Sequence, residues 1–302
     1  MSAVNFADRL ADAYRRKDSI AVLGVDPQLD SPEAGAGIPA GYTLTRFCCE
    51  TVEACAPYVV AIKPQLAFYE ARGIDGMRAL AEVLALARRL GLIAIADAKR
   101  GDIGSTSAAY AEAFLGDGDF AADAVTVNPY LGSDAIMPFV ARIRDGRGVL
   151  VLVRNSNPSS GEFQDLPVDG RPVWELVAMR VGGLGGDFIG NCGLSAIGAV
   201  VGATYPQQAR RARELMPNAV ILVPGYGRQG ATAIDAVAAA RPDGLGTIVN
   251  ASRSLMYAYR ERPGIAPPVA AAEAANAMRL DLKRALTTIG TSSGGTSPGK
   301  HR

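Results

Sequence analysis

The stretch "GMRALAEVLALARRLGLIAIADA", residues 76–98, contains two successive patterns of apolar residues. In its first part, apolar residues from Met77 to Ala87 recur at intervals of three and four, which predicts one buried face of a helix. Gly91 follows at a position where helices commonly end. The next run, "LIAIADA", is almost continuously apolar, as is typical of a parallel strand buried on both faces. The stretch therefore predicts a helix that leads directly into a strand of a parallel sheet.

Seven further apolar runs of this kind occur along the 302 residues, and most segments between them have helical patterns. Eight strands alternating with helices favour an α/β fold, a single-domain (β/α)8 TIM barrel, over a doubly wound sheet. We expect the barrel to cover residues 1–287 and the Gly/Ser-rich tail, residues 288–302, to be disordered. The eight predicted strands are 19–26, 58–64, 92–98, 122–129, 148–155, 195–202, 218–225 and 245–252.

Composition and charge exclude several classes of function. The chain is 49% hydrophobic and 20% charged, with a formal net charge of +1. This balance gives no general attraction for nucleic acid or an anionic membrane, so a bound phosphate would need a local site. No apolar run is long enough to span a bilayer, and the first residues lack the apolar core of a signal peptide. We therefore expect a cytoplasmic protein.

Histidine and cysteine usage limits the chemistry further. The only histidine is His301, which lies in the tail, and the four cysteines have no spacing typical of a zinc site or a disulfide framework. Acid–base catalysis by histidine and histidine metal sites are therefore not expected, and we predict no metal site. Carboxylates and lysines are the leading candidates for catalytic groups.

Charged residues stand where three consecutive predicted strands end. Asp26 ends the first strand, Lys63 the second, and Asp97 with Lys99 the third, while Asp102 follows on the next loop. Active sites of (β/α)8 barrels lie at this end of the strands. Asp97 and Lys99 are two residues apart and should face one way, with Lys63 roughly 5 Å away on the adjacent strand. Solvated strand ends are the alternative interpretation, but alternating charges on three strands favour a site.

Two loops indicate a phosphate site, and a third indicates a lid. Gly225, Gly227 and Gly230 follow the seventh predicted strand, and Arg253 follows the eighth, in the loops that usually bind phosphate in such barrels. A tight strand-to-helix connection is the alternative for the glycines. The long connection 155–171 has no clear helical or strand period, and its position after the fifth strand favours a lid over a disordered insertion.

The motif "DAKRGDIGST" (97–106), preceded by "AIKPQ" (61–65), resembles the charged tetrad of the orotidine 5'-phosphate decarboxylase family. "VGATYP" and "NASRS" are similar to the longer bacterial branch of that family. The resemblance extends from about Asp26 to Arg253 and leaves out residues 180–194 and the tail. It implies a homodimeric TIM barrel that decarboxylates orotidine 5'-phosphate to UMP without a cofactor, the last step of de novo pyrimidine nucleotide synthesis.

The same resemblance implies a role for each candidate residue. Lys99 would protonate C6 of the pyrimidine, and Asp97 and Lys63 would complete the charge array. The further roles that it implies are Asp102 and Thr106 in the site of the partner subunit, Asp26 at the ribose, Ser156 at the pyrimidine, and Gln229 and Arg253 at the phosphate.

Two alternatives remain open from the sequence. One is a magnesium-dependent decarboxylase or aldolase of sugar phosphates from the same superfamily, which a requirement for metal would reveal. The other is a non-catalytic barrel that binds a nucleotide as a sensor, which would bind without turnover.

Overall fold

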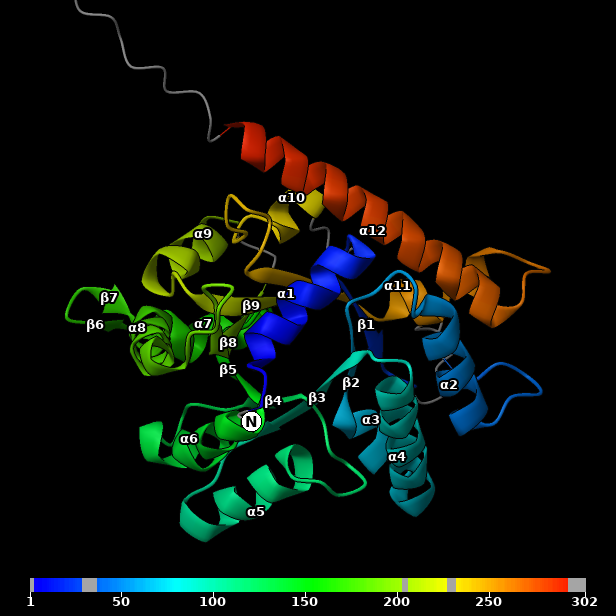
Figure 1. Cartoon of the computed structure of the whole chain (residues 1–302), viewed down its shortest axis with the longest axis horizontal. Helices are drawn as coiled ribbons and strands as arrows, with labels where there is room; N and C mark the ends of the chain where they lie inside the picture. The colour runs from blue at the N-terminus through cyan, green and yellow to red at the C-terminus, as the bar shows by residue number, and fades with distance from the viewer. Residues whose placement is uncertain (1–2, 29–36, 203–205, 227–231, 293–302) are drawn as a thin grey trace, which may run out of the picture.

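Eight parallel strands close into a barrel in the computed structural model, which describes residues 3–28, 37–202, 206–226 and 232–292 (Figure 1). The strand order is β1-β10-β9-β8-β5-β4-β3-β2, and β1 pairs with both β10 and β2. This closure confirms the predicted barrel and is incompatible with an open, doubly wound sheet. The barrel strands are β1 (Ala21–Val25), β2 (Ala61–Pro64), β3 (Ile93–Arg100), β4 (Ala124–Val127), β5 (Gly148–Arg154), β8 (Ser195–Val201), β9 (Ala219–Pro224) and β10 (Thr247–Ala251).

Burial explains why the strands are so uniformly apolar. Every residue of β1, β2, β4, β8 and β10 is buried. One face of each strand fills the barrel interior and the other packs under the helical layer, so neither face tolerates an alternating polar pattern. Lys63 and Asp97 are buried charges in this sheet, and both lie toward the ends of their strands.

Helices surround the barrel (Figure 1). Among them, α4 (Gly73–Arg89) has the predicted buried face. Leu80, Leu84 and Ala87 are buried there, and Gly91 follows with φ of +64°, the left-handed conformation that glycine adopts at little cost. The other helices around the sheet are α1 (Phe6–Lys17), α2 (Leu44–Cys55), α3 (Leu66–Glu70), α5 (Gly104–Leu115), α6 (Ser133–Val140), α8 (Val173–Gly185), α9 (Pro206–Leu215), α10 (Ala233–Ala236), α11 (Arg253–Met256) and α12 (Pro267–Ser292).

The last helix, α12, runs along one side of the molecule and packs against α2, α10 and α11 (Figure 1). It continues to Ser292, beyond the predicted domain boundary at residue 287, and residues 293–302 of the predicted tail lie outside the described residues. Within the described ranges, no helix combines the length and apolar character needed to cross a membrane.

The connection after β5 contains short regular elements that its sequence does not reveal. A 3-10 turn (Pro158–Ser160) leads into α7 (Gly161–Gln164), and β6 (Pro167–Val168) pairs with β7 (Arg171–Pro172) in a two-stranded hairpin. Elements of two to four residues are too short to produce a detectable hydrophobic period. The interpretation of this segment as irregular was therefore wrong for its local structure, whereas its expected role as a lid is not tested by the fold.

Candidate active site

Three of the predicted charged side chains meet at the carboxyl end of the barrel. The Lys63 ammonium on β2 lies 2.6 Å from Oδ2 of Asp97 on β3, and the Lys99 ammonium lies 2.5 Å from Oδ1 of the same carboxylate. β2 and β3 are neighbours in the sheet, as predicted. Asp97 is therefore a buried carboxylate held between two lysines.

Two polar residues that the sequence analysis missed complete the surroundings of Asp97. The Gln65 amide donates to Oδ2 at 3.1 Å, and the Thr126 hydroxyl on β4 donates to Oδ1 at 3.0 Å. Each carboxylate oxygen thus accepts two hydrogen bonds, which fixes the orientation of the group. Thr126 is the one polar residue in the buried run of β4, and this isolated hydroxyl was the available signal.

Lys99 has a backbone conformation that is uncommon for its residue type. Its φ is +48°, and the register between β3 and β4 shifts between Ala96 and Arg100. Non-glycine residues with positive φ cost free energy and are found disproportionately at functional sites. The backbone N–H of Lys99 donates to the Thr126 hydroxyl at 2.9 Å, which holds this irregular turn in place. Lys99 therefore reaches Asp97 from a bulge, and not from the regular strand that the two-residue spacing implied.

The exposure of the two lysines differs. The Lys63 side chain is 4% exposed, whereas that of Lys99 is 42% exposed. Lys63 is thus part of the barrel interior, and Lys99 is the ammonium group that a molecule at the mouth of the barrel can contact.

Electrostatics favour the charged forms of Asp97 and Lys63. Burial raises the pKa of the Asp97 carboxyl, but Lys63 and Lys99 together outweigh burial and hold this pKa well below its usual range. Burial lowers the pKa of Lys63, yet Asp97 and Asp26 outweigh it, so this pKa lies above its ordinary value. Burial raises the pKa of Asp26 above its ordinary value, although the nearby Lys63 and a contact with the Ser252 hydroxyl act in the opposite direction. These mutual effects indicate that Asp26 belongs to the same cluster.

Asp102 and Thr106 do not join the cluster within one chain. Oδ1 of Asp102 accepts a hydrogen bond of 2.7 Å from the backbone N–H of Ile103, at the start of α5. Thr106 is exposed in the first turn of that helix. Asp102 therefore lies on the loop between β3 and α5, and Thr106 lies on the exposed first turn of α5.

The loop that carries Ser156 is organised by Arg154, a buried residue at the end of β5 that the sequence analysis also missed. The Arg154 guanidinium donates to the side chains of Ser160, Gln164 and Asp165 at 3.0–3.1 Å. It also reaches Gln208 on α9 at 3.0 Å. Arg154 thus ties the short helix after β5 to a second part of the helical layer.

Ser156 itself packs at the end of two strands. A Cβ added at Gly202, just after β8, would come within 2.8 Å of the Ser156 Cβ. The absence of a side chain at Gly202 therefore lets the loop after β5 cross the end of β8 closely.

The predicted phosphate residues are described in part. Arg253 opens α11 directly after β10, and Gly225 follows β9 with φ of +93°. Gln229, Gly227 and Gly230 lie outside the described residues. The structure thus places Arg253 and Gly225 at the carboxyl ends of adjacent strands, while the predicted role of Gln229 stays a prediction.

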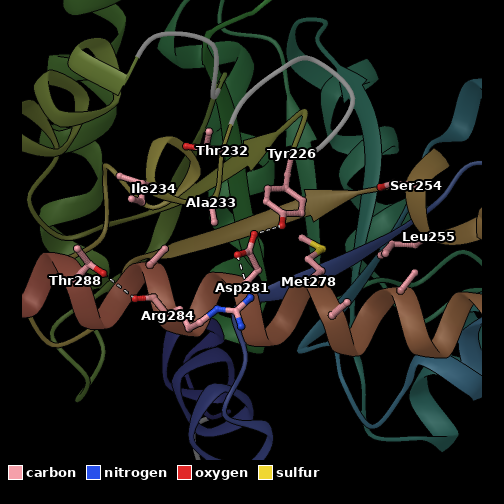
Figure 2. Close-up of a pocket in the computed structure, with 13 residues that line it drawn as sticks. Tyr226, Thr232, Ala233, Ile234, Ser254, Leu255, Met278, Asp281, Arg284 and Thr288 are labelled. Carbon is pink, nitrogen blue, oxygen red and sulfur yellow. Dashed lines mark hydrogen bonds and ion pairs between the residues drawn. The ribbon is translucent and has the colours of Figure 1, made fainter.

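A pocket of about 780 Å³ lies against α12, next to Tyr226 after β9 and Ser254 after β10 (Figure 2). Tyr226 projects from the end of β9 into it and donates a hydrogen bond of 2.6 Å to Asp281 on α12. Ser254 and Thr232 also line the pocket. Neither Lys63 nor Lys99 lines the pocket, so it is separate from the charged cluster.

Fold and site together define a class: a (β/α)8 barrel with a cluster of lysines and a carboxylate at the ends of its strands, where active sites of this fold lie. The family model described as "Orotidine 5'-phosphate decarboxylase / HUMPS family" matches residues 29–266, and the chain belongs to this family.

Relatives of known name agree with this membership. The chain is 42% identical over 273 residues to the orotidine 5'-phosphate decarboxylase of Rhodopirellula baltica, covering 85% of this chain and 90% of the relative. It is 41% identical over 283 residues to the enzyme of that name from Deinococcus radiodurans, covering 93% and 98%. The OMP decarboxylase structure from Leishmania donovani superposes with a TM-score of 0.71 at 34% identity, over 93% of this chain and 99% of that one.

Proposed function

We propose that this chain decarboxylates orotidine 5'-phosphate to UMP without a cofactor, with Lys99 as the proton donor to C6. The observation that carries the proposal is the array of Lys63, Asp97 and Lys99, in which a buried carboxylate holds two ammonium groups within 2.6 Å. The family and its relatives supply the substrate.

The chemistry of the reaction matches this array. When the bond between C6 and the carboxylate breaks, the electron pair stays on C6, where no π-system can accept it. A preorganised ammonium group at that position stabilises the developing negative charge without reorganisation. The Lys99 ammonium then transfers a proton to C6, CO2 leaves, and the neutral amine regains its proton from solvent.

Asp97 and Lys63 prepare Lys99 for this role. Asp97 accepts from Lys99 and thereby holds the ammonium in position, while Lys63 and Thr126 hold Asp97. The positive φ of Lys99 aims its side chain from the bulge of β3 toward the barrel mouth. The substrate would meet an ammonium group whose position is set before binding.

Other contacts extend the proposal to the rest of the nucleotide. Arg253 and Gln229 bind the phosphate, Asp26 binds the ribose, and Ser156 binds the pyrimidine from the loop that Arg154 organises. Binding energy from these remote groups contributes to the stability of the transition state at C6.

The proposal includes a homodimer in which Asp102 and Thr106 enter the site of the partner subunit. Two apolar side chains near these residues are exposed: Ile103 just before α5, with an exposed fraction of 59%, and Tyr130 after β4, with 85%. The loops that follow β3 and β4 are adjacent, because the N–H of Asn128 donates to the carbonyl of Arg100 at 2.8 Å. Exposed apolar residues of this size at one edge favour contact with a second copy of the chain.

The bonding of Asp97 favours this reaction over the magnesium-dependent alternative. A magnesium ion coordinates carboxylate oxygens, whereas both oxygens of Asp97 already accept two hydrogen bonds from protein donors. A metal at Asp97 would have to displace at least one of these donors.

The test is to incubate the purified protein with orotidine 5'-phosphate in EDTA and to follow the ultraviolet absorbance and the formation of UMP. We expect UMP to form at the same rate with and without added magnesium. Turnover only with magnesium would support the metal-dependent alternative. Binding of the nucleotide with no turnover under either condition would support the sensor alternative.

A further inference from the structure

Three polar side chains lie at the carboxyl ends of the neighbouring strands β1 and β10: Asp26, Asn250 and Ser252. Oδ1 of Asp26, Oδ1 of Asn250 and Oγ of Ser252 are buried without a hydrogen bond of regular geometry among the described residues. Ser252 contacts the Asp26 carboxyl, and this contact lowers the pKa of Asp26. Asn250 is 6% exposed, at the end of β10, and Asp26 follows the adjacent strand β1. Buried polar groups are nearly always well hydrogen-bonded in native proteins, so unmet hydrogen-bonding capacity at three atoms in one place indicates a ligand site.

The side chains of Asn250 and Ser252 lie over Gly24 in the barrel interior. A Cβ added at Gly24 would lie 2.7 Å from the Ser252 Cβ and 3.1 Å from both terminal atoms of the Asn250 amide. Gly24 is paired in register with Lys63 on β2. The absence of a side chain at Gly24 therefore makes room for the amide and the hydroxyl beside the charged cluster.

The chemistry of the three groups is that of a hydrogen-bond acceptor site. The Asp26 carboxylate and the Asn250 carbonyl only accept, and the Ser252 hydroxyl can accept or donate. Their natural complement is a ligand with two adjacent hydroxyl groups, each of which donates one hydrogen bond. The phosphate and the pyrimidine carboxylate of the substrate are anions without such donors, so the sugar is the part of the nucleotide that fits.

We propose that Asn250 and Ser252 form, together with Asp26, the part of the site that recognises the sugar hydroxyls and selects ribonucleotides over deoxyribonucleotides. This inference rests on the proposed function and assigns two further specificity-determining residues to it. The unpaired atoms lower the stability of the empty protein and become hydrogen-bonded when the nucleotide binds.

Kinetics with modified substrates test the inference. Asn250→Ala is expected to lower kcat/KM for orotidine 5'-phosphate by about 10-fold to 100-fold, as loss of a hydrogen bond from a buried group does. Asn250 would accept a hydrogen bond from one of the two sugar hydroxyls, and either the 2'-deoxy or the 3'-deoxy substrate lacks that hydroxyl. With this substrate, Asn250→Ala and wild type should have the same kcat/KM. Equal fold-losses on all three substrates would overturn the assignment.

Thr247→Val is the matched control. Thr247 lies on the same strand, 2% exposed, and its hydroxyl also has no partner among the described residues. It lies at the start of β10, at the end of the barrel away from the mouth. We expect Thr247→Val to leave kcat/KM unchanged for all three substrates. A loss with Thr247→Val equal to that with Asn250→Ala would show a general effect of β10 on the fold and would overturn the proposal.

Thermal unfolding gives a readout that does not depend on turnover. We expect Asn250→Ala to melt close to wild type without ligand, because the amide oxygen has no bond to lose. UMP should raise the melting temperature of wild type more than dUMP does, and Asn250→Ala or Ser252→Ala should abolish this difference. An unchanged difference in both variants would reject the sugar site. Absence of decarboxylation by wild type would instead reject the proposed function, while the UMP and dUMP comparison would still report on the site.

Discussion

Asp97→Asn is the substitution that most sharply perturbs the charge array, because it removes the only negative charge between two ammonium groups. The side chains of Lys63 and Asp97 are 4% and 9% exposed. Removing one partner of a buried ion pair costs about 3–5 kcal/mol, and here Lys63 would stay buried with only Asp26 to compensate its charge. We therefore expect the free energy of unfolding at pH 7 to fall by about this amount, and kcat to fall by about 10²-fold to 10³-fold with the loss of preorganisation.

The pH dependence of the difference has a defined sign. The pKa of Asp97 is held below its ordinary value, so its stabilising contribution is fully present above the carboxyl pKa of the unfolded chain, about 3.9. The contribution is lost as the pH falls from there toward the folded pKa. Asp97→Asn lacks it at every pH, so the difference in stability between the two proteins should narrow below about pH 4.

Urea denaturation at pH 7 and at successively lower pH measures both effects. Asp75→Asn is the control, because Asp75 forms an exposed ion pair with Arg78 on α4, which should contribute less than about 1 kcal/mol. If Asp97→Asn had the same free energy of unfolding as wild type at pH 7, with the same slope against urea concentration, the reasoning that Asp97 compensates a buried lysine would be refuted.

Three further predictions concern the rest of the site. Arg253→Ala should cost about 2–5 kcal/mol in kcat/KM with orotidine 5'-phosphate but little with the nucleoside orotidine; equal losses on both would remove Arg253 from the phosphate site. Arg154→Gln should make residues 158–165 more susceptible to limited proteolysis, because it breaks the contacts that hold this segment; an unchanged cleavage rate would contradict that role. Inactive Lys99→Ala and Asp102→Ala dimers, mixed so that subunits exchange, should recover roughly a quarter of wild-type activity, whereas no recovery after exchange verified by mass spectrometry would exclude a shared site.

The barrel was predictable because its strands are buried on both faces. Continuous apolar runs are rare outside parallel sheets, and eight of them separated by amphipathic helices leave few other architectures. The short elements after β5 were not predictable, since they depend on the side chain of Arg154 and not on an apolar pattern. The extent of α12 beyond residue 287 was also missed, because the Gly/Ser content of the tail obscures where the helix ends.

The clustering of Lys63, Asp97 and Lys99 was predictable from the sequence, but its geometry was not. Asp97 and Lys99 were expected to point together from a regular strand, whereas the bulge and the positive φ of Lys99 bring them together. Such local strain depends on tertiary contacts, here the bond from the Lys99 N–H to Thr126, which no spacing in the sequence encodes. Uncharged polar groups were missed as well: Asn250 stands in a buried apolar run as Thr126 does, whereas Gln65 follows the end of β2 and has no such signal.

The central claim, that Lys99 donates the proton to C6 of the nucleotide, is tested most directly by analysing the product formed in D2O. The fully exchanged enzyme should convert orotidine 5'-phosphate, in the presence of EDTA, to UMP that carries one deuterium at C6 in its NMR spectrum. Lys99→Ala, with a circular dichroism spectrum like that of wild type, should form no UMP on the same timescale. UMP formed by Lys99→Ala at a rate near that of wild type would contradict the account.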